Sequence, residues 1–361
     1  MIPEIVTDFP GNELLKWYKH HQRPLPWRES DDPYHIWVSE IMLQQTRVET
    51  VIPYYNRFIR TFPDVYRLAE ADRQNLLKLW EGLGYYSRAR NLQDAARVVV
   101  NEFGGSLPSG YNDIISLKGI GPYTAAAILS IAFQQPFAVV DGNVIRVLSR
   151  YYGIKDDIRS QSTKNEIQDI ADEILIQSSP GDFNQALMEL GATVCLPKTP
   201  ECDHCPLSAG CIAYRTSSSD VIPFKSPAKK IPHHHIGVGM LTDKDDRLLI
   251  ALRPEDTMLG GLWEFPGGKQ KPNETIETTV KRELKEELGV DVRVQEKFMD
   301  LKHTYSHFRI TLHAFWCLLE PENQTPIPKS SQQVKWVKPG QLEKYPFPKA
   351  NKILTERLQE L

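Results

Sequence analysis

Four of the five cysteines fall close together in the chain, with the spacing C-x6-C-x2-C-x5-C: Cys195, Cys202, Cys205 and Cys211. Their thiolates can hold one metal group only if the backbone between them forms a loop, and Pro197, Pro200 and Pro206 favour a loop over a helix. A zinc site usually has two Cys-x2-Cys pairs, and this segment has only one. The uneven spacing suits a [4Fe-4S] cluster better. We therefore predict an iron–sulfur loop over 195–211, with zinc or inert thiols as the alternatives.

Hydrophobic periodicity changes once along the chain, at a polar, proline-interrupted stretch over 216–232. Apolar residues before it recur at helical spacing, and we expect helices that include Ile36–Val48, Arg73–Trp80, Arg88–Phe103, Asn112–Leu117, Thr124–Phe133 and Val144–Tyr152. After it come one helix and several short strands: Glu274–Leu288, then His235–Leu241, Arg247–Leu252, Val290–Val294, Ile310–Leu319 and Gln333–Val337. We predict a helical domain over 1–215, a linker over 216–232 and an α+β domain over 233–361.

The charge balance limits how the chain can bind a polyanion. Its 43 basic and 46 acidic residues give a formal net charge of -3, so any affinity for nucleic acid must come from local patches. No apolar run is long enough to span a membrane, and charges interrupt the N-terminal segment, so we expect a monomeric cytosolic protein with no membrane partner. Five cysteines are too few for a disulfide scaffold, and Cys317 is expected in a core.

The segment Leu117–Thr124 (LKGIGPYT) joins two predicted helices through a glycine turn and reads as a helix-hairpin-helix. Gly119 and Gly121 let the backbone approach a phosphate, and the helix that follows offers unpaired N–H groups. Such a unit holds a DNA backbone without formal charge and without reading the sequence. The alternative is an ordinary helix end that terminates in glycine.

Two carboxylates carry the predicted chemistry. Asp141 follows the apolar run at 137–140 and precedes a helix, where capping N–H groups and the helix dipole are expected to keep it ionised. Glu40 shares one apolar helix face with Ile36 and Leu43, so burial should raise its pKa. A glutamate of raised pKa paired with an aspartate of lowered pKa is the arrangement of acid and stabilising anion that cleavage of a glycosidic bond requires. The alternatives are a simple helix cap and a partly exposed glutamate.

Together the hairpin, the Asp141 segment and the cysteine loop resemble the helix-hairpin-helix DNA glycosylase superfamily. Three further segments narrow the resemblance to its MutY-type adenine DNA glycosylases: Pro24–Arg28 (PLPWR), Val38–Arg47 (VSEIMLQQTR) and Gly82–Leu92 (GLGYYSRARNL). The resemblance implies a mainly α glycosylase fold with two helical subdomains and a [4Fe-4S] loop, followed by an α+β Nudix-like domain. It also implies base-excision repair of double-stranded DNA, in which adenine opposite 8-oxoguanine or guanine is flipped out and removed. In a bacterium such a protein would be associated with the nucleoid.

The resemblance also assigns catalytic roles. It implies that Glu40 protonates adenine N7 and that Asp141 stabilises the oxocarbenium ion, with Tyr123 hydrogen-bonded in the same site. Bifunctional relatives have a nucleophilic lysine where this chain has Tyr123, which cannot form a Schiff base. We therefore expect a monofunctional glycosylase, with Lys118 in the hairpin as the only nearby source of weak lyase activity.

The DNA contacts that the resemblance implies fall into three groups. It implies pocket-wall contacts from Arg23, Leu25, Trp27, Arg28, Leu43 and Val48. Gln45 and Tyr85 are implied to wedge into the base stack, and Thr46 and Leu83 to lie close to 8-oxoguanine. At Gln185 some relatives carry glutamate, which leaves its contact with the base open.

A second motif lies in the predicted α+β domain. The residues that fit G-x5-E-x7-R-E-U-x-E-E-x-G-U, where U is aliphatic, are Gly268, Glu274, Arg282, Glu283, Leu284, Glu286, Glu287, Gly289 and Val290. This complete Nudix box places Glu283, Glu286 and Glu287 on one helix, able to hold magnesium against a diphosphate, unless it is simply a solvated charged helix. The resemblance implies instead a reader of 8-oxoguanine, contacted through Ser306 and His307.

Three functions remain open from the sequence. The first is the adenine glycosylase with a C-terminal reader domain. The second adds a magnesium-dependent nucleotide diphosphatase in the Nudix-like domain. The third is a non-catalytic DNA-binding protein, which the two carboxylates disfavour.

Overall fold

The computed structural model describes residues 9–227, 230–305 and 307–360, and its contacts divide the chain into two units. The first unit comprises Met1–Glu70 and Asn91–Ala228, and the second comprises Ala71–Arg90 and Lys229–Leu361. Residues 71–90, which we expected in the helical domain, thus pack with the C-terminal part. Trp263 Nε1 donates to Gln74 Oε1 (2.8 Å), and Phe347 N donates to Glu81 Oε1 (2.9 Å).

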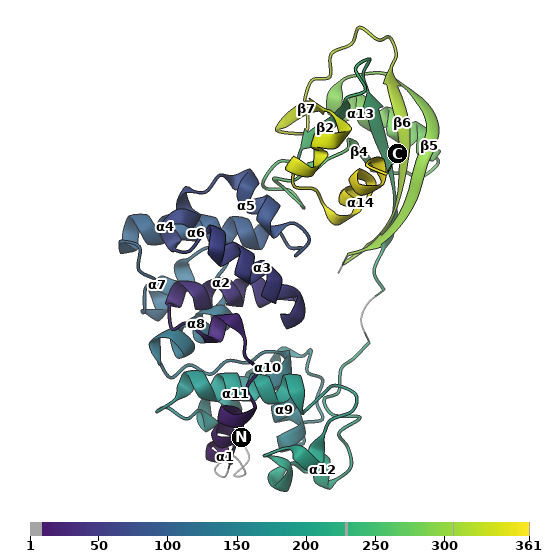
Figure 1. Ribbon diagram of the computed structural model, residues 1–361. Helices are drawn as coiled ribbons and strands as arrows, with labels where there is room; N and C mark the ends of the chain where they lie inside the picture. Colours follow the sequence, from purple (N-terminus) through teal and green to yellow (C-terminus); the bar gives the residue numbers. More distant parts are fainter. Residues whose placement is uncertain (1–8, 228–229, 306, 361) are drawn as a thin grey trace. The chain divides into compact units, whose positions relative to one another are not determined.

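The first unit is helical (Figure 1). Its α-helices are α1 (Gly11–His21), α2 (Pro33–Leu43), α3 (Val48–Thr61), α4 (Val65–Glu70), α7 (Tyr111–Ser116), α8 (Pro122–Phe133), α9 (Gly142–Tyr152), α10 (Gln161–Ile174), α11 (Pro180–Thr193) and α12 (Ile212–Arg215), and α6 (Ser87–Phe103) belongs to both units. Short 3-10 helices cover Pro26–Arg28, Cys202–His204 and Ser208–Gly210. One buried cluster joins α1, α9, α10 and α11 through Leu14, Leu148, Ile167 and Phe183.

The predicted helix over Ile36–Val48 is wrong at its C-terminal end. Helix α2 stops at Leu43, Gln45 adopts a left-handed backbone conformation (φ 58°), and α3 begins at Val48. A left-handed residue cannot continue a right-handed helix, and a non-glycine residue pays a steric cost to adopt it. Apolar periodicity does not detect such a break because Leu43 and Val48 both keep the helical pattern.

The second unit is built on a seven-stranded sheet in the order β3-β2-β1-β6-β5, with β4 beside β1 and β7 beside β2. The strands are β1 (His233–Thr242), β2 (Leu248–Leu252), β3 (Trp263–Glu264), β4 (Gly267–Lys269), β5 (Val292–Thr304), β6 (Arg309–Leu319) and β7 (Gln333–Val337). Strands β1 and β6 are parallel, and the other pairs are antiparallel. Strand β5 extends ten residues beyond its predicted end at Val294. The added residues are mostly polar, and the register shifts after Val294, so the alternation of apolar and polar residues is hidden in the sequence.

Helices cover both faces of this sheet. The helices of the unit are α5 (Arg73–Trp80), α13 (Ile276–Leu288), α14 (Lys349–Leu358) and a 3-10 helix over Pro339–Lys344. Met240 of β1 packs in a cluster with Leu354 of α14, whereas Leu241, its neighbour in sequence, packs with Leu284 of α13. Since successive strand residues point to opposite faces, the two helices lie on opposite sides of the sheet (Figure 1). The α+β class is thereby confirmed, and Cys317 is buried in the core beneath α13.

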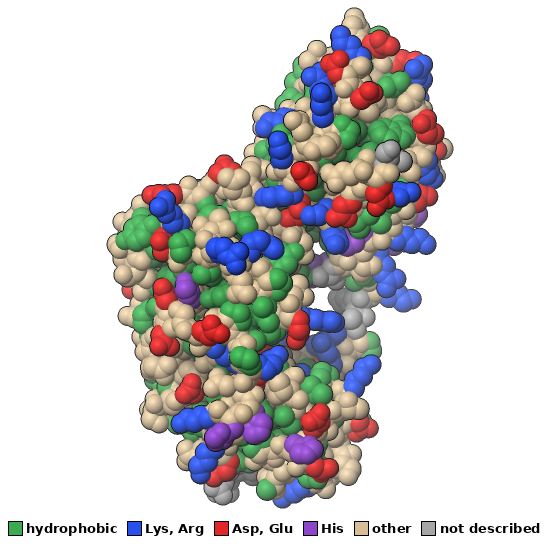
Figure 2. Space-filling model, in the orientation of Figure 1, with side chains coloured by type: hydrophobic (Ala, Val, Ile, Leu, Met, Phe, Trp, Pro, Cys, Tyr) green, Lys and Arg blue, Asp and Glu red, His purple; other side chains and the backbone are tan. Residues whose placement is uncertain are grey.

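The face of the molecule drawn in Figure 2 carries no uniform basic field. On the face drawn in Figure 2, Lys and Arg side chains are interspersed with Asp and Glu side chains on both units. Among the described residues, no helix combines the length and apolar character that a membrane crossing requires.

Candidate active site

A cavity of about 200 Å³ in the first unit brings together most of the residues that the sequence assigned to catalysis and base binding. From the predicted set it is lined by Arg23, Leu25, Trp27, Arg28, Glu40, Leu43, Thr46, Val48, Tyr123 and Asp141. Helices α2, α8, α9 and α11 contribute to its wall, with the 3-10 helix at Pro26–Arg28. Residues from positions 23 to 192 therefore meet in one concave site.

Glu40 lies on the buried face of α2 and is 7% exposed. Burial, together with the negative charge of Asp141, raises the pKa of Glu40 to about 7. A hydrogen bond with Tyr123 and the charge of Arg28 act in the opposite direction but are weaker. A carboxyl group with this pKa is available as a proton donor near neutral pH, as the sequence predicted.

Asp141 is the N-cap of α9, as predicted. Its Oδ1 accepts hydrogen bonds from the backbone N–H groups of Asn143 and Val144 (2.8 Å each), and its Oδ2 accepts from Asn143 Nδ2 (2.8 Å). The predicted lowering of its pKa is wrong, because burial raises the pKa of Asp141 more than these donors lower it. Asp141 nevertheless remains the stronger acid of the pair, since its negative charge raises the pKa of Glu40 whereas Glu40 is not among the groups that shift the pKa of Asp141.

Tyr123, in the first turn of α8, lines the cavity and hydrogen-bonds with Glu40, while its hydroxyl lies 3.7 Å from Met188 Sδ. Lys118 is not among the cavity residues. Its side chain is 62% exposed, and its Nζ lies 2.7 Å from Asp94 Oδ2. A lysine held by an aspartate outside the cavity is poorly placed to attack a sugar within it.

Several cavity residues were not predicted: Ser39, Ile131, Asn143, Met188, Glu189 and Ala192. Glu189 is the most informative, because its side chain is fully buried and pairs with Arg23 and Arg28. The sequence offered the same signal for Glu189 as for Glu40, because Glu189 too is a glutamate within an apolar helical segment, at 186–192. Its arginine partners, more than 160 positions away, give no local signal.

Three predicted DNA-contacting residues outside the cavity lie at turns. Gln45 and Tyr85 both have left-handed backbones (φ 58° and 48°), as does Gly119 (φ 88°). A side chain at Gly119 would come within 2.9 Å of Asn91 Cβ, whereas one at Gly121 would meet nothing within 4 Å. Non-glycine residues held in this conformation concentrate at binding sites.

An open basic groove adjoins the cavity at Asp141. Its cations come from α9, from the start of α10 and from the stretch after α12: Arg146, Arg159, Lys164 and Lys225. Arg146 is engaged with Asn143 Oδ1 and with the carbonyl oxygens of Gly191 and Cys195, whereas Arg159, Lys164 and Lys225 are exposed. The groove is a local patch of the kind that a chain of net charge -3 needs in order to bind a polyanion.

The four clustered cysteines line one small cavity. Arg150 Nη1 donates to Cys195 Sγ (3.3 Å), and backbone N–H groups approach Cys205 and Cys211, as is typical around iron–sulfur thiolates. In the described part of the chain, no group of three or more His, Cys, Asp or Glu side chains is arranged to hold a metal ion.

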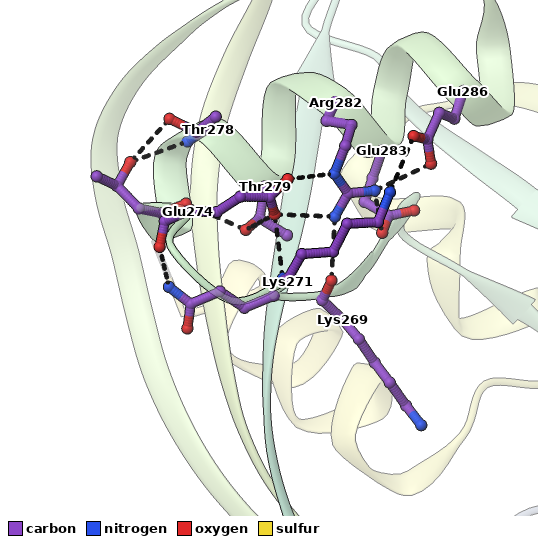
Figure 3. Close-up of polar contacts among 10 residues, drawn as sticks. Lys269, Lys271, Glu274, Thr278, Thr279, Arg282, Glu283 and Glu286 are labelled. Carbon is purple, nitrogen blue, oxygen red and sulfur yellow. Dashed lines mark hydrogen bonds and ion pairs between the residues drawn. The ribbon is translucent and has the colours of Figure 1, made fainter.

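The carboxylates of the Nudix box are held by Arg282 (Figure 3). Its guanidinium lies 2.6 Å from Glu274, 2.8 Å from Glu283 and 2.9 Å from Glu286. Burial raises the pKa of Glu287 to about 8, helped by the charge of Glu264, although Gly267 N donates to its carboxylate (3.1 Å). Of the predicted magnesium ligands, Glu283 and Glu286 are thus paired with Arg282, whereas Glu287 is buried near a second carboxyl group, that of Glu264.

A second cavity, of about 560 Å³, lies within the second unit. Leu83 and Tyr85 line it with Tyr305, His307 and Met258. The Tyr305 and Phe308 rings stack with centroids 4.8 Å apart. Ser306, predicted to contact 8-oxoguanine, lies outside the described residues.

Two family profiles match the chain, one in its helical part and one in its α+β part. The HhH-GPD superfamily of base excision DNA repair proteins matches residues 38–173, and the NUDIX domain matches residues 237–357. Among solved structures, a thermostable thymine-DNA glycosylase has a TM-score of 0.52 and 30% identity, covering 57% of this chain and 95% of that one. A trapped endonuclease III–DNA covalent intermediate has a TM-score of 0.50 at 20% identity, with 57% and 94% coverage, and supports the fold alone.

Full-length relatives extend the similarity over both units. The adenine DNA glycosylase of Mus musculus is 35% identical over 384 residues, covering 92% of this chain and 74% of the mouse protein. The Homo sapiens enzyme is 35% identical, with 92% and 70% coverage. That of Buchnera aphidicola subsp. Schizaphis graminum is 36% identical over 301 residues, with 83% and 84% coverage. With these identities spanning more than two thirds of each relative, the chain belongs to the adenine DNA glycosylase family.

Proposed function

We propose that this DNA glycosylase removes adenine mispaired with 8-oxoguanine, or with guanine, from double-stranded DNA and that it acts without a lyase step. The observation that carries the proposal is the pair of carboxyl groups in one cavity, of which Glu40 has its pKa raised to about 7. Two carboxyl groups with separated pKa values are suited to acid-assisted cleavage of a glycosidic bond. A non-catalytic DNA-binding protein has no need of this pair.

The reaction begins when adenine is flipped out of the duplex into the cavity. Glu40 donates its proton to N7, which makes the base a neutral leaving group as the bond to C1′ breaks. Asp141 lies on the same cavity, where its carboxylate stabilises the positive charge that develops on the sugar. Water then adds to C1′, and Glu40, now ionised, accepts its proton.

The absence of a lysine at position 123 supports hydrolysis rather than amine attack. Tyr123 instead hydrogen-bonds with Glu40 and helps to hold the acid in place. The ion pair of Lys118 with Asp94 further reduces any lyase contribution from the hairpin.

Several features support duplex DNA as the substrate. The turn at Gly119 and Gly121 would hold a phosphate, and the basic groove beside Asp141 would follow the backbone away from the flipped nucleotide. Gln45 and Tyr85, at left-handed turn positions, would fill the space that the adenine leaves.

We assign recognition of 8-oxoguanine to the second-unit cavity. Leu83, Tyr85 and His307 line it, and the Tyr305 ring offers an aromatic face for a base. Ser306, the neighbour in sequence of Tyr305 and His307, is the further proposed contact.

We also propose that Cys195, Cys202, Cys205 and Cys211 bind a [4Fe-4S] cluster. Their shared cavity and the N–H groups that approach their sulfur atoms fit such a group. When bound, the cluster would brace the loop that follows α11, and no step of the reaction requires it to change oxidation state.

A magnesium-dependent nucleotide diphosphatase remains the second candidate for the Nudix unit, favoured only by the completeness of the box. Arg282 already pairs with Glu274, Glu283 and Glu286, so it competes with a cation for their carboxylate oxygens. We therefore expect no pyrophosphate release from 8-oxo-dGTP with magnesium. Release that is lost in both Glu286→Gln and Glu287→Gln would establish the second activity.

The proposed function is tested with a duplex that contains one adenine opposite 8-oxoguanine. Wild-type protein should produce a site that is cleaved only after alkali treatment, and Glu40→Gln and Asp141→Asn should not. The same duplex with cytosine opposite 8-oxoguanine is the control. If the wild-type protein leaves no alkali-labile site, the assignment is wrong, and strand cleavage without alkali would overturn the monofunctional mechanism.

A further inference from the structure

Glu189 is a buried carboxylate in the base cavity that has no part in the proposed proton transfer. Its Oε1 accepts from Arg23 N (3.0 Å) and Arg23 Nε (2.7 Å), and its Oε2 accepts from Arg23 Nη2 (3.1 Å) and Arg28 Nη2 (2.9 Å). Burial alone would raise the pKa of Glu189, but the hydrogen bonds from Arg23 and the charge of Arg28 lower it overall. Glu189 is therefore an ionised, fully hydrogen-bonded anchor for two arginines.

The anchored Arg28 in turn orients Gln185. All three nitrogens of the Arg28 guanidinium are engaged, with Nη2 on Glu189, Nη1 on the carbonyl oxygen of Arg23 (3.0 Å) and Nε on Gln185 Oε1 (3.2 Å). Arginine can only donate, so the oxygen and not the nitrogen of the Gln185 amide must face it. Among the described residues none accepts from the Gln185 NH₂ group, and Gln185 lines the cavity.

Helix α11 places the two ends of this chain of contacts on one face. Gln185 and Glu189 are four residues apart, so they lie one above the other on the cavity side. Glu189 thus binds the guanidinium of Arg28, which in turn binds the amide oxygen of Gln185. The NH₂ group of Gln185 is the last group in this series, and it is a hydrogen-bond donor directed away from Arg28.

We propose that Glu189 is a positioning residue that, by fixing Arg28, holds the NH₂ group of Gln185 as a donor to N1 of the flipped adenine. The inference rests on the proposed function and names the contact that selects the base. Enzymes that flip a base read its Watson–Crick edge by hydrogen bonds. N1 of adenine accepts a hydrogen bond, whereas N1 of guanine carries a hydrogen and would oppose the Gln185 donor, so the contact discriminates between the two purines.

The same anchor affects the general acid. Glu40 faces Asp141 from α9, Tyr123 from α8 and Arg28 from the 3-10 helix. Arg28 is the cation in this set, and Glu189 balances its charge. Replacing Glu189 by glutamine would leave that positive charge unbalanced, which favours ionisation of Glu40 and moves the pH midpoint of excision downward.

The test compares single-turnover excision of adenine and 1-deazaadenine, both opposite 8-oxoguanine, in four proteins. The wild-type rate should fall roughly fivefold to tenfold on 1-deazaadenine, the effect of one lost hydrogen bond. Gln185→Leu and Glu189→Gln should remove adenine more slowly but process both bases at nearly equal rates. Glu81→Gln is the matched control, because it also neutralises a buried, ion-paired glutamate but in the second unit, and it should keep the wild-type ratio.

The outcomes separate the inference from the proposed function. If the wild-type protein does not excise adenine at all, the proposed function fails. If it excises both bases equally, or if Glu189→Gln slows both by one factor and leaves the pH midpoint unchanged, Glu189 is merely structural and the inference is overturned. Loss of discrimination together with a lower pH midpoint in Glu189→Gln supports it.

Discussion

Glu40 and Asp141 line one cavity, and the charge of Asp141 adds to the burial that raises the pKa of Glu40 to about 7. The two groups thus act on each other before any substrate binds. The negative charge of Asp141 helps to keep Glu40 protonated, so one arrangement would provide both the proton donor and the stabilising anion of the proposed reaction.

Replacing Glu40 by glutamine should lower the rate of adenine excision by roughly 10²- to 10⁴-fold, because the amide cannot protonate the leaving base. Single-turnover assays under enzyme excess measure this directly. Glu102→Gln, at an exposed position near the end of α6, is the control and should match the wild-type rate. A Glu40→Gln protein with near wild-type activity would exclude Glu40 as the acid.

Excision should depend on pH with a single falling limb near neutrality. Glu40 must be protonated to act, so the rate should be constant well below pH 7 and fall as the pH rises through about 7. At pH 8 the rate should be roughly a tenth of its plateau, since about that fraction of the acid remains protonated. A rate that increases from pH 6 to 8 would mean that Glu40 acts only as a base.

Two substitutions at Asp141 should separate its roles. Asp141→Asn retains a side-chain oxygen that can cap α9, whereas Asp141→Ala removes the cap and should cost about 1 kcal/mol in the free energy of unfolding. Both should lack excision activity. Chemical denaturation followed by circular dichroism measures the difference, and equal stabilities would show that the cap contributes little.

Cys202→Ser should lose iron and the visible absorbance of the purified protein, because the proposed cluster requires four thiolates. Cys317→Ala should keep both, since Cys317 lies in the core beneath α13. Iron and acid-labile sulfide analyses quantify the result. Zinc in place of iron in wild-type protein purified without oxygen would support the alternative site.

Neutralising the basic groove should weaken DNA binding in a salt-dependent way. Each phosphate contact contributes about 0.9 to the slope of log K against log salt, so Arg159→Ala, Lys164→Ala and Lys225→Ala together should reduce that slope by roughly 2 to 3. Fluorescence anisotropy at several salt concentrations provides the slope. The pair Lys16→Ala and Lys19→Ala on α1 is the control, and an equal effect of that pair would argue against a specific groove.

The sequence predicts local features of the site better than its long-range pairings. Burial of Glu40 and the cap at Asp141 follow from apolar periodicity and from the start of a helix, and both are confirmed. The raised pKa of Asp141 does not follow, because it depends on the cavity wall that covers the residue. Glu189 has a detectable local signal, but its pairing with Arg23 and Arg28 exists only in the folded chain.

For the fold, too, the sequence predicts local features better than long-range packing. The class, helices α2, α6, α7, α8 and α9 of the first unit and strand β7 follow from periodicity, and β7 has the predicted bounds. The break at Gln45 and the short strands β3 and β4 carry no periodic signal, since the break spans only residues 44–47 and the two strands have two and three residues. The packing of residues 71–90 with the C-terminal part is a tertiary choice that local patterns do not encode.

Asp141 caps the first turn of α9 with the same carboxylate that we propose stabilises the sugar cation. Selection on this position therefore has two sources, and only one of them concerns DNA repair. A lineage that abandoned base excision would still be under pressure to keep a side chain that can cap the helix, whether aspartate, asparagine or serine. An acidic residue at this position in a diverged homologue is thus weak evidence of retained activity. Glu40 caps no helix, so its loss would be the earlier sign in a sequence that excision activity has been lost.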